Sequence, residues 1–194
     1  MRPIRRLCVY CGSAMGNDPQ HAAAASELGA CLAAAGIGLV YGGGRVGLMG
    51  AIADAVLAAG GEVTGIIPAH LRDAELAHRG ATELLVVDSM HERKRVMAER
   101  ADAFAVLPGG IGTLDETFEI LAWRHLALHD KPVLVVDIGG YWQPLFALLD
   151  HIVASGFAAP PIARLMRAVP DIPALMAALS HATSPAERPP TELF

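Results

Sequence analysis

A glycine-rich stretch that ends in an acid is the part of the sequence best suited to chemistry. It reads Pro108-Gly109-Gly110-Ile111-Gly112-Thr113-Leu114-Asp115-Glu116. An apolar run precedes it and a run with helical spacing follows it, so the pattern predicts a strand, a tight turn and a helix. The glycines let a bulky anion approach the backbone N–H groups closely, and the helix start adds unpaired N–H groups and the positive end of its dipole. We therefore expect a phosphate-binding turn with the carboxylate of Glu116 beside it.

The same residues also fit a purely structural interpretation. Thr113 and Glu116 have the spacing of a capping box, in which Thr113 caps the helix and Glu116 reaches back to its N–H group. This spacing is typical of helix starts in general. On this interpretation Glu116 stabilises the helix and takes no part in chemistry.

A second group of charged residues opens an earlier helix. We expect Ser89 and Glu92 to form a capping box there, which places Arg93 and Lys94 in the first turn. Positive charge at that end interacts unfavourably with the helix dipole and destabilises the helix by about 0.3–1 kcal/mol. An anionic ligand would offset this cost. The alternative is a solvated face of mixed charge, made by Arg93, Lys94, Arg95 and Arg100 with Glu92 and Glu99.

Another glycine turn follows an apolar run at residues 37–41. It contains the pattern G-x-G-x-x-G at Gly42, Gly44 and Gly47, and Glu62 lies about 20 residues further on, as the ribose-binding acid of a dinucleotide fold would. A dinucleotide-dependent oxidoreductase is therefore an alternative function, although the sequence offers no obvious hydride-transfer partner. If the ligand is a mononucleotide, a second phosphate contact is expected from Gly42, Gly43 and Gly44.

Seven apolar runs alternate with helical patterns and must position these turns. They cover residues 7–11, 37–41, 63–67, 83–87, 104–107, 132–136 and 165–169. Continuous apolar runs are typical of strands that are buried on both faces of a parallel sheet. We predict one α/β domain over residues 1–182, with a Rossmann-like, doubly wound parallel sheet and helices on both faces, and a flexible tail over residues 183–194. Ligands of such folds bind beyond the carboxyl ends of the strands, where both glycine turns are expected.

Composition narrows the class of partner. The chain of 194 residues is 53% hydrophobic and has a net charge of −5 without charged blocks, which argues against binding to a nucleic-acid polymer. Glycines interrupt the longest uncharged run, and the basic N-terminus lacks a signal-peptide core, so we expect a cytoplasmic protein that does not enter a membrane. Cys8 and Cys11 have redox spacing within one strand, but we expect buried, reduced thiols. No metal-ligand spacing is apparent.

Three motifs together resemble the LOG (Lonely Guy) family of cytokinin riboside 5′-monophosphate phosphoribohydrolases. They are Gly42-Gly43-Gly44 with Gly47-Leu48-Met49-Gly50, Met90-His91-Glu92-Arg93-Lys94, and the stretch from Pro108 to Glu116. The resemblance runs from about residue 7 to residue 181. It implies hydrolysis of the N-glycosidic bond of a cytokinin riboside 5′-monophosphate, and of AMP as a further substrate, to a free base and ribose 5-phosphate. It also implies a homodimer, and the reaction that it implies requires no metal or cofactor.

The resemblance assigns roles to individual residues. Arg93 and Glu116 match the family's catalytic pair. Its nucleotide-binding positions match Glu75, Arg93, Lys94, Gly110, Ile111, Gly112, Thr113, Leu114, Asp115 and Glu116. Ala122 precedes Trp123 where plant members have a substrate-binding threonine, so the preferred base is open. A non-catalytic module of the same fold, which carries or senses a nucleotide, is the other function that the sequence allows.

Overall fold

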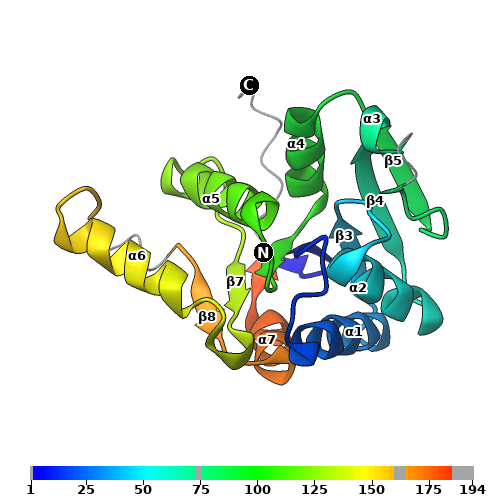
Figure 1. Cartoon of the computed structure of the whole chain (residues 1–194), viewed down its shortest axis with the longest axis horizontal. Helices are drawn as coiled ribbons and strands as arrows, with labels where there is room; N and C mark the ends of the chain where they lie inside the picture. Colours follow the sequence, from blue (N-terminus) through cyan, green and yellow to red (C-terminus); the bar gives the residue numbers. More distant parts are fainter. Residues whose placement is uncertain (1, 73–75, 160–164, 185–194) are drawn as a thin grey trace.

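The computed structural model describes residues 2–72, 76–159 and 165–184. Its centre is a seven-stranded parallel sheet, as predicted, with the order β5-β4-β3-β2-β6-β7-β8 (Figure 1). The strands agree with the predicted runs to within about two residues at each end. They are β2 (Arg6–Tyr10), β3 (Gly38–Tyr41), β4 (Val63–Pro68), β5 (Glu83–Val87), β6 (Ala103–Val106), β7 (Val133–Val136) and β8 (Arg167–Val169).

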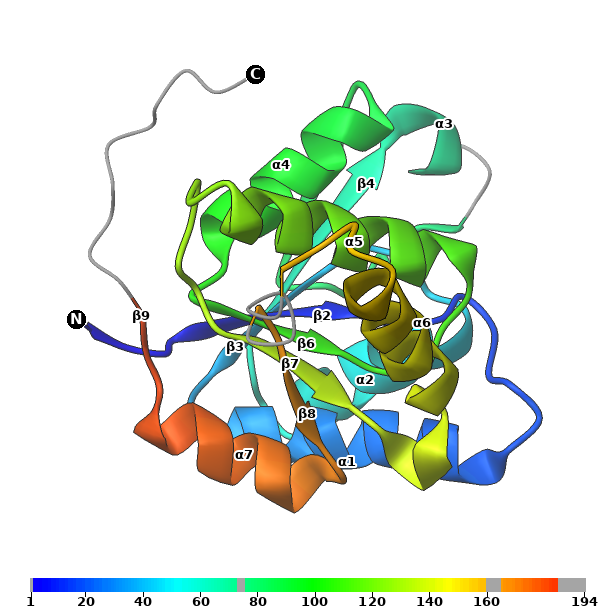
Figure 2. The ribbon, with the colours of Figure 1, turned by 90° about the vertical axis from the view of Figure 1, so that its left-hand side faces the viewer.

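Helices cover both faces of the sheet, which confirms the doubly wound architecture (Figure 2). One face carries α1 (Pro19–Ala34), α2 (Gly47–Ala58) and α7 (Ile172–His181). The other carries α4 (Met90–Arg100), α5 (Ile111–His125) and α6 (Gln143–Ala154). Two short elements, α3 (Ala69–Leu71) and the 3-10 helix η2 (Ile138–Gly140), follow β4 and β7. None of the helices in these described ranges is long and apolar enough to cross a membrane.

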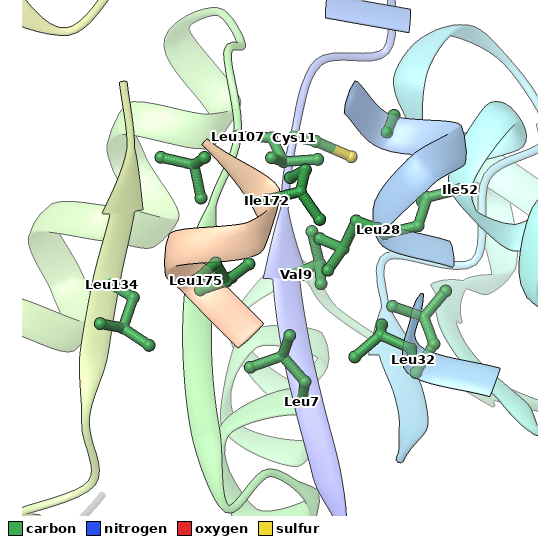
Figure 3. Packing of buried hydrophobic residues seen from close by; sticks show 14 of the residues in the cluster. Leu7, Val9, Cys11, Leu28, Leu32, Ile52, Leu107, Leu134, Ile172 and Leu175 are labelled. Atoms are coloured by element: carbon green, nitrogen blue, oxygen red, sulfur yellow. The ribbon is translucent and has the colours of Figure 1, made fainter. Parts of the chain in front are cut away.

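The central strands supply apolar side chains to both layers because successive residues of a strand point to opposite faces. In β2 and the residue after it, Leu7, Val9 and Cys11 pack toward α1, α2 and α7, as Figure 3 shows. Cys8 and Tyr10 pack toward α4, α5 and α6. Cys8 and Cys11 are both free and buried, as predicted, and burial raises the pKa of each thiol well above its usual range.

The winding direction of the sheet reverses between its two central strands, β2 and β6. At their carboxyl ends the loops meet closely, because the N–H group of Gly12 donates to the carbonyl of Pro108 at 3.0 Å. The start of α2 joins them: a Cβ atom at Gly47 would lie 2.2 Å from the carbonyl carbon of Ser13. A reversal of this kind opens the crevice in which α/β proteins bind their ligands.

The two ends of the described chain lie together. Strand β1 (Arg2–Pro3) pairs antiparallel with β9 (Thr183–Ser184). The first two residues of the predicted flexible tail are therefore paired in a strand, and residues 185–194 lie outside the described ranges.

Candidate active site

Arg93 is the centre of a buried polar cluster at the carboxyl edge of the sheet. Its Nε donates to the carbonyl of Ile66 at 3.2 Å, and its Nη2 donates to the carbonyl of Gly42 at 3.3 Å. Its Nη1 lies 3.2 Å from Oε1 of Glu116, and the two side chains are only 10% and 9% exposed. The solvated-face interpretation is therefore wrong for Arg93, because Glu116 and two carbonyls offset the charge that opposes the helix dipole.

The start of the helix that carries Arg93 forms one half of the predicted capping box, because Ser89 is the N-cap but Glu92 reaches back to Asp88 instead of Ser89. The hydroxyl of Ser89 accepts from the N–H group of Glu92 at 3.1 Å, and a carboxylate oxygen of Glu92 accepts from the N–H group of Asp88 at 3.0 Å. Arg95 pairs with Glu99 at 2.7 Å on the surface of α4. The mixed-charge face therefore exists, but Arg93 points away from it.

Glu116 does not cap a helix. Helix α5 begins at Ile111 with Gly110 as its N-cap, so Thr113 already lies inside the first turn and Glu116 lies one turn further along. The capping-box interpretation is wrong, because the glycine turn lets the helix start before Thr113. The side chain of Glu116 is directed instead to Arg93.

Burial makes Glu116 an unusual carboxyl group. Desolvation raises its pKa to about 7, although the positive charge of Arg93 opposes this increase, and the negative charge of Asp115 adds to it. Both protonation states are therefore accessible near neutral pH. A carboxyl group tuned in this way is suited to accept or release a proton during a reaction.

The turn after β3 accommodates the guanidinium of Arg93. Gly42, Gly43 and Gly44 are all buried. A Cβ atom at Gly42 would lie 1.7 Å from Nη2 of Arg93. The carbonyl of Gly43 accepts from the N–H group of His78 at 2.9 Å, which ties the turn to the segment after residue 75. These contacts give the turn a structural role, and a phosphate contact from it stays a prediction.

The dinucleotide alternative is wrong on geometric grounds. Glu62 comes immediately before β4, and the parallel register pairs Leu39 with Val63 at the beginning of β3 and β4. The Gly42 turn follows the opposite end of β3. Glu62 and the glycine pattern therefore lie at opposite edges of the sheet, so Glu62 cannot reach a ribose bound at that turn.

Lys94 links the two helices that carry the buried pair. Its ammonium lies 3.1 Å from Oδ2 of Asp115 and 3.1 Å from Oε2 of Glu119, both on α5. The sequence pattern of the site did not indicate Glu119, since nothing except the fold brings α4 against α5. The structure thus places Lys94 beside Glu116, with its charge compensated by two carboxylates.

The start of α5 presents the predicted phosphate turn. Gly110, Ile111 and Gly112 are exposed, whereas Thr113 is buried and Leu114 is half-buried. The first N–H groups of a helix have no carbonyl partner within the helix, and here they belong to Ile111, Gly112 and Thr113. The exposed backbone and the buried acid therefore lie within two turns of one helix.

Comparisons with known proteins show the family of the chain. A family model described as "Possible lysine decarboxylase" matches residues 49–179. A rice protein (Oryza sativa subsp. japonica) named "Probable cytokinin riboside 5′-monophosphate phosphoribohydrolase" is 47% identical over 173 residues, which cover 89% of this chain and 76% of that protein. A "Cytokinin riboside 5′-monophosphate phosphoribohydrolase" from Rhodococcoides fascians is 42% identical over 176 residues, which cover 90% and 89%. The chain belongs to the LOG family.

More distant structures share the fold of this LOG family member. A molybdenum cofactor carrier protein from Chlamydomonas reinhardtii superposes with a TM-score of 0.68 at 21% identity, over 92% of this chain and 96% of that one. A molybdenum cofactor binding protein from Rippkaea orientalis gives 0.66 at 20% identity, over the same two fractions. At these identities the similarity extends to the fold alone.

The description of the family model does not fit the lysines of the chain. Pyridoxal phosphate enzymes hold their cofactor through a lysine amine that forms a Schiff base. The sequence contains two lysines, Lys94 and Lys131. Lys94 pairs with Asp115 and Glu119, and the ammonium of Lys131 donates to the carbonyl of Ala98 at 2.8 Å. Lys94 therefore joins α4 to α5, and Lys131 joins the loop before β7 to α4.

Glu75 lies outside the described residues, so its predicted place in the nucleotide site stays a prediction. Ala122 is exposed on α5 and precedes the half-buried Trp123. Besides Glu119, the structure adds a second residue that sequence analysis missed, Tyr141, whose hydroxyl donates to the carbonyl of Gly109 at 2.6 Å. Its position directly after the Gly139-Gly140 exit turn of β7 was the only signal for it.

Proposed function

We propose that this protein hydrolyses the N-glycosidic bond of nucleoside 5′-monophosphates, with a cytokinin riboside 5′-monophosphate as its main substrate and AMP as a second one. The buried Arg93–Glu116 pair beside an exposed glycine turn carries this proposal. The names of the relatives support the substrate class. The products are the free base and ribose 5-phosphate.

The phosphate binds at the start of α5. The N–H groups of Ile111, Gly112 and Thr113, together with that of Gly110, form the anion seat, and the helix dipole favours negative charge there. Gly42, Gly43 and Gly44 are proposed as a second contact. Binding the phosphate holds the ribose in one orientation for attack, which lowers the entropic part of the barrier.

Glu116 acts on the sugar and on the attacking water. Cleavage of a glycosidic bond passes through an oxocarbenium-like state, which a carboxylate beside the ribose stabilises. The bond between the anomeric carbon and the base nitrogen breaks, and the bonding electrons leave with the base. A water molecule adds to the anomeric carbon and gives one proton to Glu116. The departing base takes up one proton from solvent, and Glu116 returns its proton to solvent before the next turnover.

Arg93 holds Glu116 in place. Its Nε, Nη1 and Nη2 all contact protein atoms, namely the carbonyls of Ile66 and Gly42 and the carboxylate of Glu116. With three contacts fixed in the plane of the guanidinium, Arg93 orients the carboxylate and keeps part of it ionised. This favours a positioning role for Arg93 over direct protonation of the base.

The test is release of free base from isopentenyladenosine 5′-monophosphate, from AMP and from the unphosphorylated riboside. We expect the wild type to cleave the two monophosphates and not the riboside, and Glu116→Gln to lose activity by at least about 10²-fold. Glu99→Gln is the matched control, because Glu99 pairs with Arg95 on the surface of α4. Binding of nucleotide without cleavage would instead favour the carrier module.

We also propose a cytoplasmic homodimer. Exposed apolar side chains follow one face of α5 at Ile111, Phe118 and Leu126, which are 82%, 38% and 65% exposed. An apolar stripe of this kind is costly in water and favours association. The dimer is tested by comparing the molecular mass of the wild type in sedimentation with that of Phe118→Glu, which we expect to be monomeric. Fractionation of the cells that produce the protein tests the cytoplasmic location.

A further inference from the structure

Tyr141 connects the end of β7 to the glycine turn before α5. It follows η2, and its hydroxyl donates to the carbonyl oxygen of Gly109 at 2.6 Å. Tyr141 is 40% exposed, and two neighbouring rings contact its ring edge-on. The centroid of His21 lies 5.3 Å away at 77°, and that of Trp142 lies 4.8 Å away at 85°. These contacts fix the direction in which the hydroxyl points.

The hydrogen bond acts on a peptide that the proposed phosphate seat uses. The carbonyl of Gly109 and the N–H group of Gly110 belong to one planar trans peptide, so they point in opposite directions. Holding the carbonyl toward Tyr141 therefore directs the N–H group of Gly110 away from it. A donor on the carbonyl also polarises the peptide and strengthens the N–H group as a donor.

The turn needs such a restraint on its open side. A Cβ atom at Gly109 would lie 2.1 Å from Oγ1 of Thr113 and 2.8 Å from the backbone nitrogen of Gly12, so that side of the turn is closely packed. A Cβ atom at Gly110 would meet no atom within 4 Å. Gly110 has the widest choice of backbone conformations of any residue, and it is the N-cap of α5.

We infer that Tyr141 is a positioning residue for anion binding: it holds the peptide between Gly109 and Gly110 so that the N–H group of Gly110 faces the substrate phosphate. The identity of the ligand rests on the proposed function. The restraint itself rests on the contacts of Tyr141. The hydroxyl contributes through the geometry of the turn and does not take part in bond cleavage.

The test compares Tyr141→Phe with the wild type. This variant keeps the ring contacts with His21 and Trp142 and removes only the hydroxyl. Loss of one hydrogen bond predicts an increase of about 3–10-fold in the Kd of ribose 5-phosphate, measured by calorimetry, and a similar increase in KM for the nucleoside monophosphate. We expect kcat to change by less than about 2-fold, because the hydroxyl does not act on the glycosidic bond.

A second variant controls for the loss of a hydroxyl group as such. The hydroxyl of Tyr41 is buried and has no hydrogen-bond partner among the described residues, so Tyr41→Phe should leave the Kd of ribose 5-phosphate unchanged. Inhibition by free adenine, which has no phosphate, should be equal in wild type and Tyr141→Phe. A merely structural role for Tyr141 would weaken adenine and ribose 5-phosphate alike and lower Tm.

The outcomes separate this inference from the proposed function. If the wild type binds ribose 5-phosphate but cleaves no monophosphate, the proposed hydrolysis fails and the Kd comparison still decides the role of Tyr141. An unchanged Kd in Tyr141→Phe overturns the inference even if hydrolysis is observed. A wild type with no measurable affinity for ribose 5-phosphate overturns it as well.

Discussion

The guanidinium of Arg93 occupies the space that a side chain at Gly42 would need, since a Cβ atom at position 42 would lie 1.7 Å from Nη2 of Arg93. The same nitrogen donates to the carbonyl of Gly42. The two residues are 51 positions apart in sequence. The absence of a side chain at position 42 is therefore a condition for the buried Arg93–Glu116 pair.

We predict that Gly42→Ala displaces the guanidinium and uncouples it from Glu116. Misplacement of a group that orients the reaction by about 1 Å can cost about 10²-fold in rate, so we expect a decrease of about that size in kcat/KM. Overpacking should also cost about 1–3 kcal/mol of stability, which denaturant unfolding would measure.

Gly38→Ala is the matched control for this prediction. Gly38 begins β3, the strand that leads into the Gly42 turn, and a Cβ atom there would have its nearest neighbours at 3.8 Å, which is ordinary contact. We expect Gly38→Ala to keep its activity. Retention of full activity by Gly42→Ala would contradict the positioning role of Arg93.

The sequence predicts the fold well because both faces of the central strands are covered. Continuous apolar runs such as residues 104–107 then indicate a parallel sheet. The start of α5 is less predictable. The capping pattern at Thr113 favours a start at about residue 114, whereas the helix begins at Ile111 on a glycine N-cap without a side-chain hydrogen bond. A glycine turn carries no side-chain signal for the first helical residue.

The site is only partly contained in its motifs. The motifs indicate Arg93 and Glu116 as site residues. The 3.2 Å contact between them depends on how α4 packs against α5. Glu119 and Tyr141 belong to no motif, and only the fold carries them to Lys94 and Gly109. Local spacing predicts which turn holds an anion, and tertiary packing determines what holds the turn.

The pH dependence of the reaction tests the ionisation of Glu116. Burial raises the pKa of this carboxyl group to about 7. If the ionised form accepts the proton of water, kcat/KM should rise about tenfold per pH unit below about pH 7 and level off above it. A decrease in kcat/KM across that interval would assign Glu116 the role of an acid instead.

The substrate phosphate also titrates, with a second pKa of about 6 for phosphate esters, so a variant must separate the two groups. The negative charge of Asp115 raises the pKa of Glu116. Asp115→Asn should therefore move the rising limb of the profile to lower pH, whereas the pKa of the free substrate cannot change. A limb that stays in place would attribute the profile to the substrate.

Asp102 offers a test of stability at the edge of the sheet opposite to the site. Its Oδ2 accepts from the N–H groups of Arg5 and Arg6, both at 2.9 Å, and the side chain is 5% exposed. Hydrogen bonds to a charged group contribute about 1.5–3 kcal/mol, so Asp102→Ala should lower the free energy of unfolding by about that amount. We expect kcat to be unchanged at temperatures where the variant is folded. Asp150→Ala, at an exposed position of α6, is the control.

His129 lies in the loop after α5 and makes the free energy of unfolding depend on pH. Its Nε2–H donates to the carbonyl of Ile120 at 2.9 Å, and its Nδ1 accepts from the N–H group of Lys131 at 3.2 Å. Protonation would destroy the second bond, and burial lowers the pKa of the ring from 6.5 to about 4. Between these two values the unfolded chain binds a proton that the folded chain does not, so the free energy of unfolding falls as the pH decreases.

Glutamine at position 129 can donate and accept as the neutral imidazole does, but it does not titrate. We therefore expect the wild type to lose more stability than His129→Gln between pH 7.5 and pH 5, as measured by urea unfolding at both values. Glu116 and the other titrating groups are present in both proteins, so their contributions cancel in the difference. Equal losses in the two proteins would show that the ring is protonated in the folded state, and that the bond from Lys131 does not keep it neutral.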